Sequence, residues 1–390
     1  MNSVQSSVTS DQLDGKRPLP EGWVWTTVGD VVSFEYGKGL TQDKRDASGK
    51  VPVYGSNGIV GYHSAALIDK PCLVIGRKGA AGAVHKSDVP CWPIDTTYFA
   101  IPPENVNLSF LYYLFLTLDL ASLDRSTAIP GLNRNDAYAV NIPLPPLPEQ
   151  ERIVTRLEEL LSNLEAGVAA LGRVRAGVKR YKASVLKAAC EGKLFGDKGI
   201  VNGELPEGWR LARLDEITDN FDGKRVPVKA SDRENMAGEY PYYGASGIID
   251  HVNDYLFDGD YLLIAEDGAN LLSRSTPIAF QAHGKFWVNN HAHVVKTKDD
   301  MPLGYLEIYL NSLDLKFYIT GTAQPKLTQA NMNKFHLPVP PLEEQRRIVA
   351  EVERRLESAR AVESAVKTGL KRAAWLRQAV LRSAFEGRLS

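Results

Sequence analysis

One stretch of the sequence decides the fold, and it occurs twice. It reads Pro145-Pro146-Leu147-Pro148-Glu149-Gln150-Glu151-Arg152-Ile153-Val154 and returns 195 positions later as Pro340-Pro341-Leu342-Glu343-Glu344-Gln345-Arg346-Arg347-Ile348-Val349. In each copy, prolines and glutamates precede apolar residues. This pattern is typical of a helix start, because acidic side chains are favoured in a first turn and proline is tolerated there. The stretch therefore predicts two equivalent helices.

Apolar residues continue from both copies at intervals of three, four or seven. The first stripe runs from Ile153 to Val185 and the second from Val349 to Ala384. Such spacing marks one face of a long amphipathic helix, and a single apolar seam is most easily buried against the other helix in an antiparallel coiled coil. About 45 residues at 1.5 Å each make a rod of roughly 65–70 Å. We expect this rod to hold apart the two parts of the chain that precede the helices.

Further sequence motifs are repeated before and after the two helix starts. Leu19-Pro20-Glu21-Gly22-Trp23 matches Leu205-Pro206-Glu207-Gly208-Trp209, Tyr54-Gly55-Ser56-Asn57-Gly58 matches Tyr243-Gly244-Ala245-Ser246-Gly247, and Glu191-Gly192-Lys193-Leu194 matches Glu386-Gly387-Arg388-Leu389. The chain is thus a tandem repeat of one module. The front of each module alternates short apolar runs with Gly, Pro, Asn and Asp clusters, which predicts strands and turns, with short helices at 109–122 and 304–316.

The predicted fold is α+β, with two β-rich heads joined by two long antiparallel coiled-coil helices in a pseudo-two-fold repeat. The predicted segments are a floppy tail at 1–17, a head at 18–147, a helix at 148–198, a second head at 199–342 and a second helix at 343–390.

Composition permits a folded chain and excludes several classes. Hydrophobic residues make up 44% and charged residues 24%, and no run of about 20 apolar residues predicts a membrane span. Cys72, Cys91 and Cys190 have no metal-ligand spacing, so we expect small buried thiols. The sequence contains no Gly-x-x-x-x-Gly-Lys-Ser/Thr phosphate loop and no methyltransferase cofactor loop with an Asn/Asp-Pro-Pro-aromatic step.

Charge is unevenly distributed along the chain. The net charge is −1, which is low for a protein that grips nucleic acid by itself. By segment it is −2 for 1–148, +3 for 149–198, −6 for 199–342 and +4 for 343–390. We therefore expect the isolated chain to bind DNA weakly.

Together, the repeated motifs resemble the specificity subunits of type I restriction-modification systems from Leu19 to Leu389. The resemblance implies that the heads are two target recognition domains and that each reads one half of a split, asymmetric DNA site. It also implies that the helices are the family's central and distal conserved helices, and that residues 386–389 lie beside Leu19-Pro20 in a pseudo-cyclic layout.

The resemblance also implies partners. They are double-stranded DNA, two modification (methyltransferase) subunits that methylate adenine, and restriction (endonuclease/translocase) subunits. S-adenosylmethionine, ATP and Mg are then expected on the partner subunits, with no cofactor or metal on this chain. The chain is expected to be a non-catalytic, cytoplasmic component of phage defence.

Candidate DNA-reading residues lie in loops of the heads. Arginine favours guanine, Asn and Gln favour adenine, and acidic residues favour the cytosine amine. Ile75-Gly76-Arg77-Lys78-Gly79 aligns with the acidic Ile264-Ala265-Glu266-Asp267-Gly268, so the two heads would prefer different sequences; a solvated hairpin turn is the alternative. The other candidates are Tyr54, Ser56, Asn57, Asn133, Arg134, Lys224, Arg225, Tyr243, Ser246, Gln324 and Lys326. The repeated Tyr54 and Tyr243 segments suit either a phosphate clamp or a structural turn.

Two further groups of residues, a histidine pair and the basic residues of the helices, allow more than one interpretation. His291 and His293, which align with Thr96 and Tyr98, lie two apart on an expected strand and would permit a metal, but a packed or hydrogen-bonded pair is favoured. The second group consists of basic residues on the two predicted helices. They fit three interpretations: contacts to phosphates of the DNA between the two half-sites, a solvated outer face, or a surface for the modification subunit. These residues are Arg173, Arg175, Lys179, Arg180, Lys367, Lys371 and Arg372.

Two rival functions remain at this point. The first is a protein-interaction scaffold with two β-rich heads on a coiled coil, which the near-neutral charge favours. The second is a nuclease that uses Glu266 and Asp267.

Overall fold

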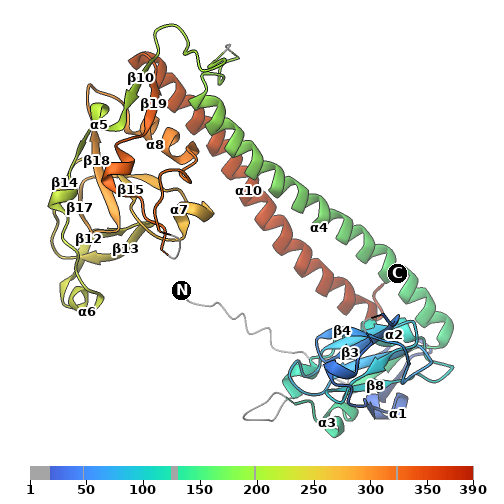
Figure 1. Cartoon of the computed structure of the whole chain (residues 1–390). Helices are drawn as coiled ribbons and strands as arrows, with labels where there is room; N and C mark the ends of the chain where they lie inside the picture. The colour runs from blue at the N-terminus through green and yellow to red at the C-terminus, as the bar shows by residue number, and fades with distance from the viewer. Residues whose placement is uncertain (1–17, 47, 124–130, 197–198, 322–323, 390) are drawn as a thin grey trace. The chain divides into compact units, whose positions relative to one another are not determined.

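The computed structural model describes residues 18–46, 48–123, 131–196, 199–321 and 324–389 (Figure 1). Its contacts divide the chain into unit 1, residues 1–171 with 368–390, and unit 2, residues 172–367. Each unit contains one head and part of each long helix, so the division falls inside the helices. The predicted tail at 1–17 lies outside the described residues.

The two long helices form where the repeated stretch predicts them. They are α4 (Leu147–Cys190) and α10 (Leu342–Phe385), each of 44 residues. In unit 1, Leu171 lies beside Gly369, and the Arg152 guanidinium donates to the Leu389 carbonyl. Residues further along α4 therefore contact residues earlier in α10, as in an antiparallel pair. In unit 2, Lys182 pairs with Glu363 and Arg355 reaches Leu194 in the same sense. The antiparallel pairing is confirmed within each unit.

Unit 1 is built around an antiparallel sheet. Its strand order is β2 (Glu35–Tyr36), β8 (Thr97–Ala100), β5 (Cys72–Gly76) and β6 (Val84–Ser87), and a second sheet has the order β4 (Gly58–His63), β3 (Val51–Gly55) and β7 (Trp92–Pro93). A separate pair joins β1 (Val24–Thr27) to β9 (Asn141–Leu144), next to short helices α1 (Val28–Val31) and α3 (Arg134–Tyr138). Because β9 immediately precedes α4, this pair anchors the head to the helix.

Unit 2 repeats this plan with longer strands. Its first sheet has the order β11 (Thr218–Asn220), β18 (Ala292–Thr297), β15 (Tyr261–Ala265) and β16 (Ala279–Ala282), and its second has the order β13 (Gly247–Val252), β12 (Ala237–Gly244), β17 (Lys285–Val288) and β14 (Phe257–Asp258). The anchoring pair is β10 (Arg210–Arg213) with β19 (His336–Val339), and the short helices are α5 (Leu214–Ile217), α6 (Ala230–Arg233), α7 (Asn270–Ser273) and α9 (Gln329–Met332).

The one longer helix of each head is shorter than predicted. Helix α2 (Leu108–Phe115) begins at an Asn107 cap and gives way to a 3₁₀ turn at Leu120–Leu123, and α8 is Leu303–Ser312. The Asp314 carboxylate accepts from the Lys316 amide, a local bond that competes with continued helix. Both helices bury apolar faces, which for α2 are Phe110, Leu111, Leu114 and Phe115.

Buried amides fasten the helix starts to the heads. The Gln150 side chain donates to the carbonyls of Pro145 and Asn105 and accepts from the Asn107 amide, and Gln345 donates to the Pro340 carbonyl. Gln150 therefore ties the loop before α2 to the start of α4, whereas Gln345 ties the start of α10 to the residue that follows β19.

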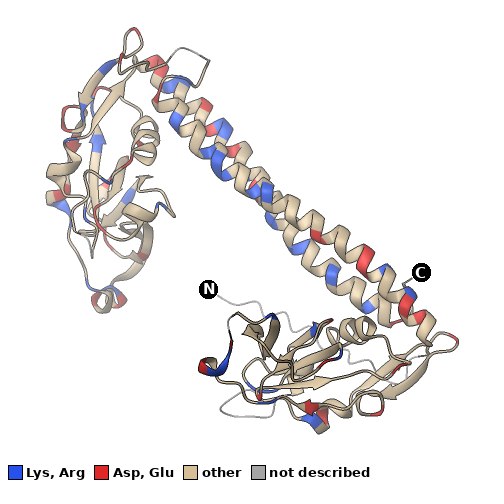
Figure 2. Ribbon diagram, turned by 45° about the vertical axis from the view of Figure 1, so that its right-hand side comes forward, with Lys and Arg blue, Asp and Glu red and all other residues tan. Residues whose placement is uncertain are grey.

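All three cysteines are buried and free, as predicted. The sulfurs of Cys72 and Cys91 lie 3.6 Å apart, and Cys190 contacts Ser312. Among the described residues, no helix is long and apolar enough to cross a bilayer. Figure 2 shows that Lys and Arg follow both long helices through their middle, where acidic residues are sparse.

Gly387 lies against Pro20, as the pseudo-cyclic layout predicts. Gly387 has a φ of +69° and its α-carbon faces Pro20, and in the other copy Gly192 has the same φ and faces Pro206. A left-handed backbone packed against a proline ring leaves no room for a β-carbon. The expectation that residues 386–389 lie beside Leu19-Pro20 is confirmed.

Gly387→Ala is expected to lower the free energy of unfolding by about 2 kcal/mol, because alanine is strained at this φ, and its β-carbon would lie 2.2 Å from the Pro20 Cγ. Urea unfolding of the full chain measures this. Gly167→Ala is the matched control: Gly167 has open space and lies inside α4, so alanine should leave stability unchanged or raise it. Equal destabilisation by both substitutions would contradict the proposed closure.

Candidate nucleic-acid interface

The loops that follow β5 and β15 occupy the same place in the two units. Gly76 pairs with Thr97 in unit 1 and Ala265 pairs with Ala292 in unit 2. One residue later, the Arg77 carbonyl accepts from the Leu132 amide, and the Glu266 carbonyl accepts from the Leu327 amide. The predicted alignment of Arg77-Lys78-Gly79 with Glu266-Asp267-Gly268 is confirmed.

In unit 1 this place is a pocket built of arginine and tyrosine. The guanidinium groups of Arg77 and Arg134 lie 5.5 and 5.4 Å from the centre of the Tyr36 ring. The open pocket has a volume of about 480 Å³ and is called the unit 1 pocket below; it is lined by Tyr36, Arg77, Lys78, Tyr98, Gly131, Leu132, Asn133, Arg134 and Asn135. Among described residues, no carboxylate lies within ion-pair distance of its three cations.

Backbone carbonyls hold the two arginines in position. Arg77 donates to the Asp95 carbonyl through two nitrogens, at 3.2 and 2.6 Å, and Arg134 donates to the Phe34 carbonyl. Burial raises the pKa of Tyr98, which keeps this phenol neutral. A cation–aromatic surface held by neutral carbonyls retains its positive charge for an anion or for acceptor atoms of a base.

The other predicted residues of unit 1 divide into exposed and internal groups. Lys78, Gly79 and Asn133 are exposed, and Gly79 has open space around it. The Asn133 oxygen caps α3. Tyr54 and Ser56 are buried, and the Ser56 hydroxyl donates into the carbonyls of Lys78 and Thr96, while Asn57 at the turn is exposed. Ser56 thus braces the Arg77 loop from inside.

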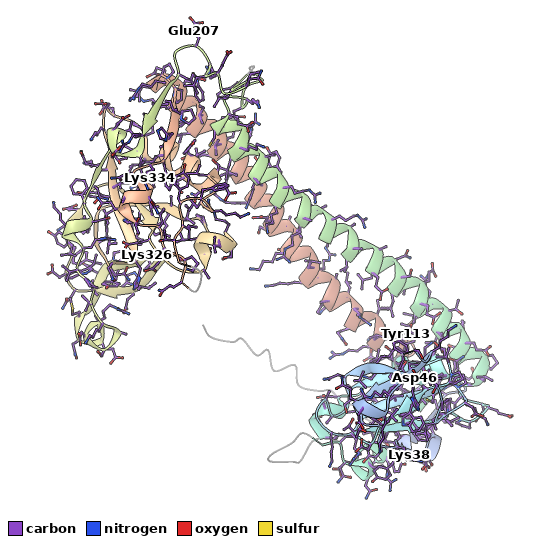
Figure 3. All side chains as sticks on the ribbon, in the orientation of Figure 1. Lys38, Asp46, Tyr113, Glu207, Lys326 and Lys334 are labelled. Atoms are coloured by element: carbon purple, nitrogen blue, oxygen red, sulfur yellow. The ribbon has the colours of Figure 1, made fainter. Side chains whose placement is uncertain are left out.

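In unit 2 the same place is filled by an ion cluster, formed by Asp222, Arg225, Glu266, His293 and Lys326. Glu266 accepts from Arg225 at 2.7 Å and pairs with Lys326 at 3.2 Å, and Asp222 lies 2.6 Å from the His293 ring (Figure 3 labels Lys326). The other His293 nitrogen faces the Leu327 carbonyl at 2.8 Å. Both ring nitrogens of His293 therefore face oxygen atoms.

The cluster keeps its acids ionised. At Glu266 burial raises the pKa, but the Arg225 hydrogen bond and the neighbouring charges of His293 and Lys326 outweigh it, so the pKa lies below its ordinary 4.5. At Asp222 burial is likewise outweighed by His293, and the pKa is lowered from 3.8. Arg225 and Lys326 therefore compensate much of the charge that the Glu266 loop would otherwise present.

The two histidines singled out from the sequence contact different carboxylates. His291 lies one residue before β18, is half exposed and contacts Asp267, whereas His293 lies on β18 and is buried in the cluster. The favoured hydrogen-bonded alternative fits both. Ligand atoms of Asp222, Glu266 and His293 come close enough for a metal, but the Arg225 guanidinium already contacts both carboxylates.

The remaining unit 2 candidates lie around the cluster. Lys224 is exposed above the Phe221 ring, Asp267 bridges to Lys326 through the backbone, and Gln324 and Ser246 are exposed. Tyr243 packs against Phe280 and Phe286. DNA contact by these residues stays a prediction, and for Arg225 it requires a side chain that is now 13% exposed.

Sequence reasoning missed Tyr36, Tyr98 and Asp222. Tyr36 pairs with Tyr98, and the extension of the equivalent pairing in unit 2 brings Asp222 beside His293. The signal that identifies them is the likeness of Tyr36-Gly37-Lys38 to Asp222-Gly223-Lys224, which is visible only after the repeat is aligned strand by strand.

The ion cluster predicts acid sensitivity of unit 2. A carboxyl with a depressed folded pKa contributes stability above its unfolded pKa, near 4.5 for Glu266, and loses it as pH falls through the folded value. Glu266→Gln should cost about 2 kcal/mol at pH 7, because it removes a hydrogen bond between charged groups and leaves Asp222 as the remaining carboxylate beside Arg225, and it should weaken the loss on acidification. Hydrogen exchange of the β15 and β18 amides measures both effects.

The control is Asp219→Asn, which removes an exposed pair with Lys298 and should change stability by less than about 1 kcal/mol. Identical acid profiles for the wild type and Glu266→Gln would refute the role given to the cluster.

Comparisons with known proteins agree with this repeated architecture. A putative type I restriction enzyme specificity subunit of Haemophilus influenzae is 40% identical over 136 residues, which are 35% of this chain and 34% of that protein. The EcoDI specificity subunit of Escherichia coli is 23% identical over 412 residues, covering 95% of this chain and 90% of that protein.

Solved structures share the fold. A chain from a structure on complex assembly and conformational transition of the type I R-M system has a TM-score of 0.74 at 19% identity, over 95% of this chain and 100% of that one. The HsdS subunit of Thermoanaerobacter tengcongensis has a TM-score of 0.58 at 23% identity, over 96% and 99%. The family model for the type I restriction modification DNA specificity domain matches residues 20–170 and 206–366. This chain therefore belongs to the family of type I restriction-modification DNA specificity proteins.

Proposed function

We propose that this chain reads a bipartite, asymmetric double-stranded DNA site, with one half of the site bound by each unit. The observation that carries the proposal is the chemical contrast at one repeated place. The unit 1 pocket presents Arg77, Lys78 and Arg134, whereas the equivalent loop of unit 2 presents Glu266 and Asp267 among compensating cations. Two copies of one framework with different charged groups are suited to different base sequences.

The chemistry of each place indicates its half-site. An arginine can donate two hydrogen bonds to the O6 and N7 atoms of guanine, and carboxylates accept from the cytosine amine. Arg77 and Arg134 are held at one pocket rim and face no described carboxylate. Asp267 is held by His291 beside the acid-rich loop. We therefore assign a guanine-containing half-site to unit 1 and a different half-site to unit 2.

The proposed partners follow from the family. Two modification subunits would dock on the chain, bind S-adenosylmethionine and methylate adenine in the selected site, and restriction subunits with ATP and Mg would join them for cleavage. The chain itself would be non-catalytic and would act in the cytoplasm. These roles rest on family membership together with the two-headed repeat.

Methylation mapping tests the whole proposal. Genomic DNA from a host that expresses the chain with its modification subunit, sequenced by a single-molecule method, should carry adenine methylation in a split, asymmetric motif. The motif should vanish when the chain is omitted. An active modification subunit whose methylation pattern ignores the chain would instead support the protein-interaction scaffold.

Arg77→Gln and Arg134→Gln should each alter only one half of that motif. Loss of a bidentate base contact costs about 1–3 kcal/mol, so methylation of the cognate half-site should fall roughly 5-fold to 150-fold, while the other half stays fixed. Lys70→Gln, an exposed cation of unit 1 outside the pocket, is the control. Exchanging Arg77-Lys78 with Glu266-Asp267 should disturb both halves; unchanged halves after the exchange would rule out these loops as readers.

A further inference from the structure

One hairpin strand of each head exposes two consecutive aliphatic side chains. On β4 these are Ile59 and Val60, with exposed fractions of 52% and 42%, and on β13 they are Ile248 and Ile249, with 50% and 53%. Both strands stand at the end of the strand order of their sheet and are therefore edge strands. Exposed aliphatic residues on an edge strand favour unwanted association, and proteins usually avoid them there. Their presence at the same place in both copies indicates a shared use.

The same irregularity of the hairpin presents the second aliphatic residue in each copy. The register of β3 with β4 skips Val60, and the register of β12 with β13 skips Ile249. Such a β-bulge inserts one residue into a strand and changes the direction of its side chain. An arginine braces each bulge: Arg45 donates to the Val60 carbonyl at 2.9 Å, and Arg233 pairs with Asp250, the residue after Ile249, at 2.8 Å.

A glycine on the neighbouring strand makes room for this side chain. A β-carbon at Gly55 would lie 3.0 Å from the Val60 Cγ1, and one at Gly244 would lie 3.3 Å from the Ile249 Cδ1. Both distances are shorter than ordinary van der Waals contact, so glycine lets the aliphatic side chain lie over the hairpin. We call Gly55, Ile59 and Val60 the unit 1 platform, and Gly244, Ile248 and Ile249 the unit 2 platform.

Each platform adjoins a residue that is equivalent in the two units. The Ile94 amide donates to the Tyr54 carbonyl at 2.8 Å, and the Asn289 amide donates to the Tyr243 carbonyl at 3.1 Å. A β-carbon at the platform glycine would lie 3.7 Å from the Ile94 Cδ1 in unit 1 and 3.5 Å from the Asn289 Nδ2 in unit 2.

The same segments hold the loops that follow β5 and β15. In unit 1, the carbonyl of Asp95, next to Ile94, accepts from the Arg77 guanidinium. In unit 2, the Asn289 side-chain oxygen accepts from the His291 amide, and the His291 ring contacts Asp267. Within each unit, the platform and the loop with the candidate base-reading residues are therefore neighbours on one support.

The contrast between platform and loop indicates what the platforms bind. The loops differ in charge between the copies, whereas both platforms consist of one glycine and two aliphatic residues. A surface that is the same in both copies suits a part of the ligand that is the same in both half-sites, and in a duplex that part is the sugar–phosphate backbone. Uncharged aliphatic groups suit the carbon atoms of deoxyribose and not the phosphates.

We propose that each platform packs against deoxyribose rings of the half-site that its own unit reads. This inference rests on the proposed function, because it takes the bound DNA from it, and it adds a contact that is independent of base sequence. Aliphatic side chains are used against DNA grooves in other proteins. Such a contact releases no counterion, so it adds affinity that does not depend on salt in the way phosphate contacts do.

The test is DNA binding by the full chain assembled with its modification subunit. Fluorescence anisotropy follows two labelled duplexes of equal length, one with the mapped site and one with a scrambled sequence, at KCl concentrations from about 50 to about 200 mM. Val60→Thr keeps the branched shape that suits a strand but replaces a methyl group with a hydroxyl. Affinity for both duplexes should fall about 4-fold, the factor for one carbon group removed from an apolar contact.

Ile249→Thr should lower affinity for both duplexes at least as much, because it removes more carbon atoms. For both variants, the slope of log K against log salt and the methylated motif should equal those of the wild type. The matched control is Val89→Thr: Val89 is 52% exposed and lies beyond the Ser87 end of β6, whereas the Arg77 loop lies at the Val84 end. This control should leave affinity unchanged.

Three results would overturn the inference. The first is unchanged affinity for both platform variants, and the second is a loss confined to the mapped duplex, which would make the platforms base readers. The third is failure of the variants to assemble with the modification subunit in size-exclusion chromatography, which would assign the platforms to that protein. If the wild type directs no methylation, the proposed function fails, while the scrambled duplex still reports whether the platforms contact DNA.

Discussion

Each long helix carries one apolar seam that it cannot bury alone, and the rest of the structure depends on how that seam is covered. In unit 1, Leu157 and Leu161 of α4 enter the same buried core as Leu381 and Phe385 of α10. In unit 2, Val185 and Ala189 of α4 join Ile348 and Val352 of α10. Isolated helices gain little stability from propensity alone. Each head therefore folds around two helix halves, one from each copy of the module.

This arrangement explains why the module is duplicated with so little change at its joints. The helix start needs the buried Gln150 or Gln345, and the helix end needs Gly192 or Gly387 packed against a proline of the adjoining head. These positions serve the framework in both copies. The loops after β5 and β15 occupy the same place but carry different residues, with Arg77 in one copy and the ion-paired Glu266 in the other.

Much of the framework could be predicted from sequence because it depends on the regular spacing of apolar residues and on repeated motifs. The apolar stripe locates both helices, and the matching motifs predict that residues 386–389 lie beside Leu19-Pro20. The site was only partly predictable. Tyr36 lies on a two-residue strand with no pattern of its own, and the partners of Glu266 are 41 and 60 residues away at Arg225 and Lys326. His291 was misplaced because the strand begins one residue after it.

Charge is distributed differently in the heads and in the long helices. In unit 2 the carboxylates of the ion cluster are held inside the head by Arg225, His293 and Lys326. The net positive charge lies on the helix segments, at +3 and +4, against −2 and −6 in the segments that contain the heads. A reader whose heads also carried a strong positive field would hold any DNA tightly and lose discrimination, because phosphate attraction is the same for every sequence. The segments that carry the excess positive charge are the long helices, which are repeated with little change, whereas the chemical difference between the copies lies in the heads.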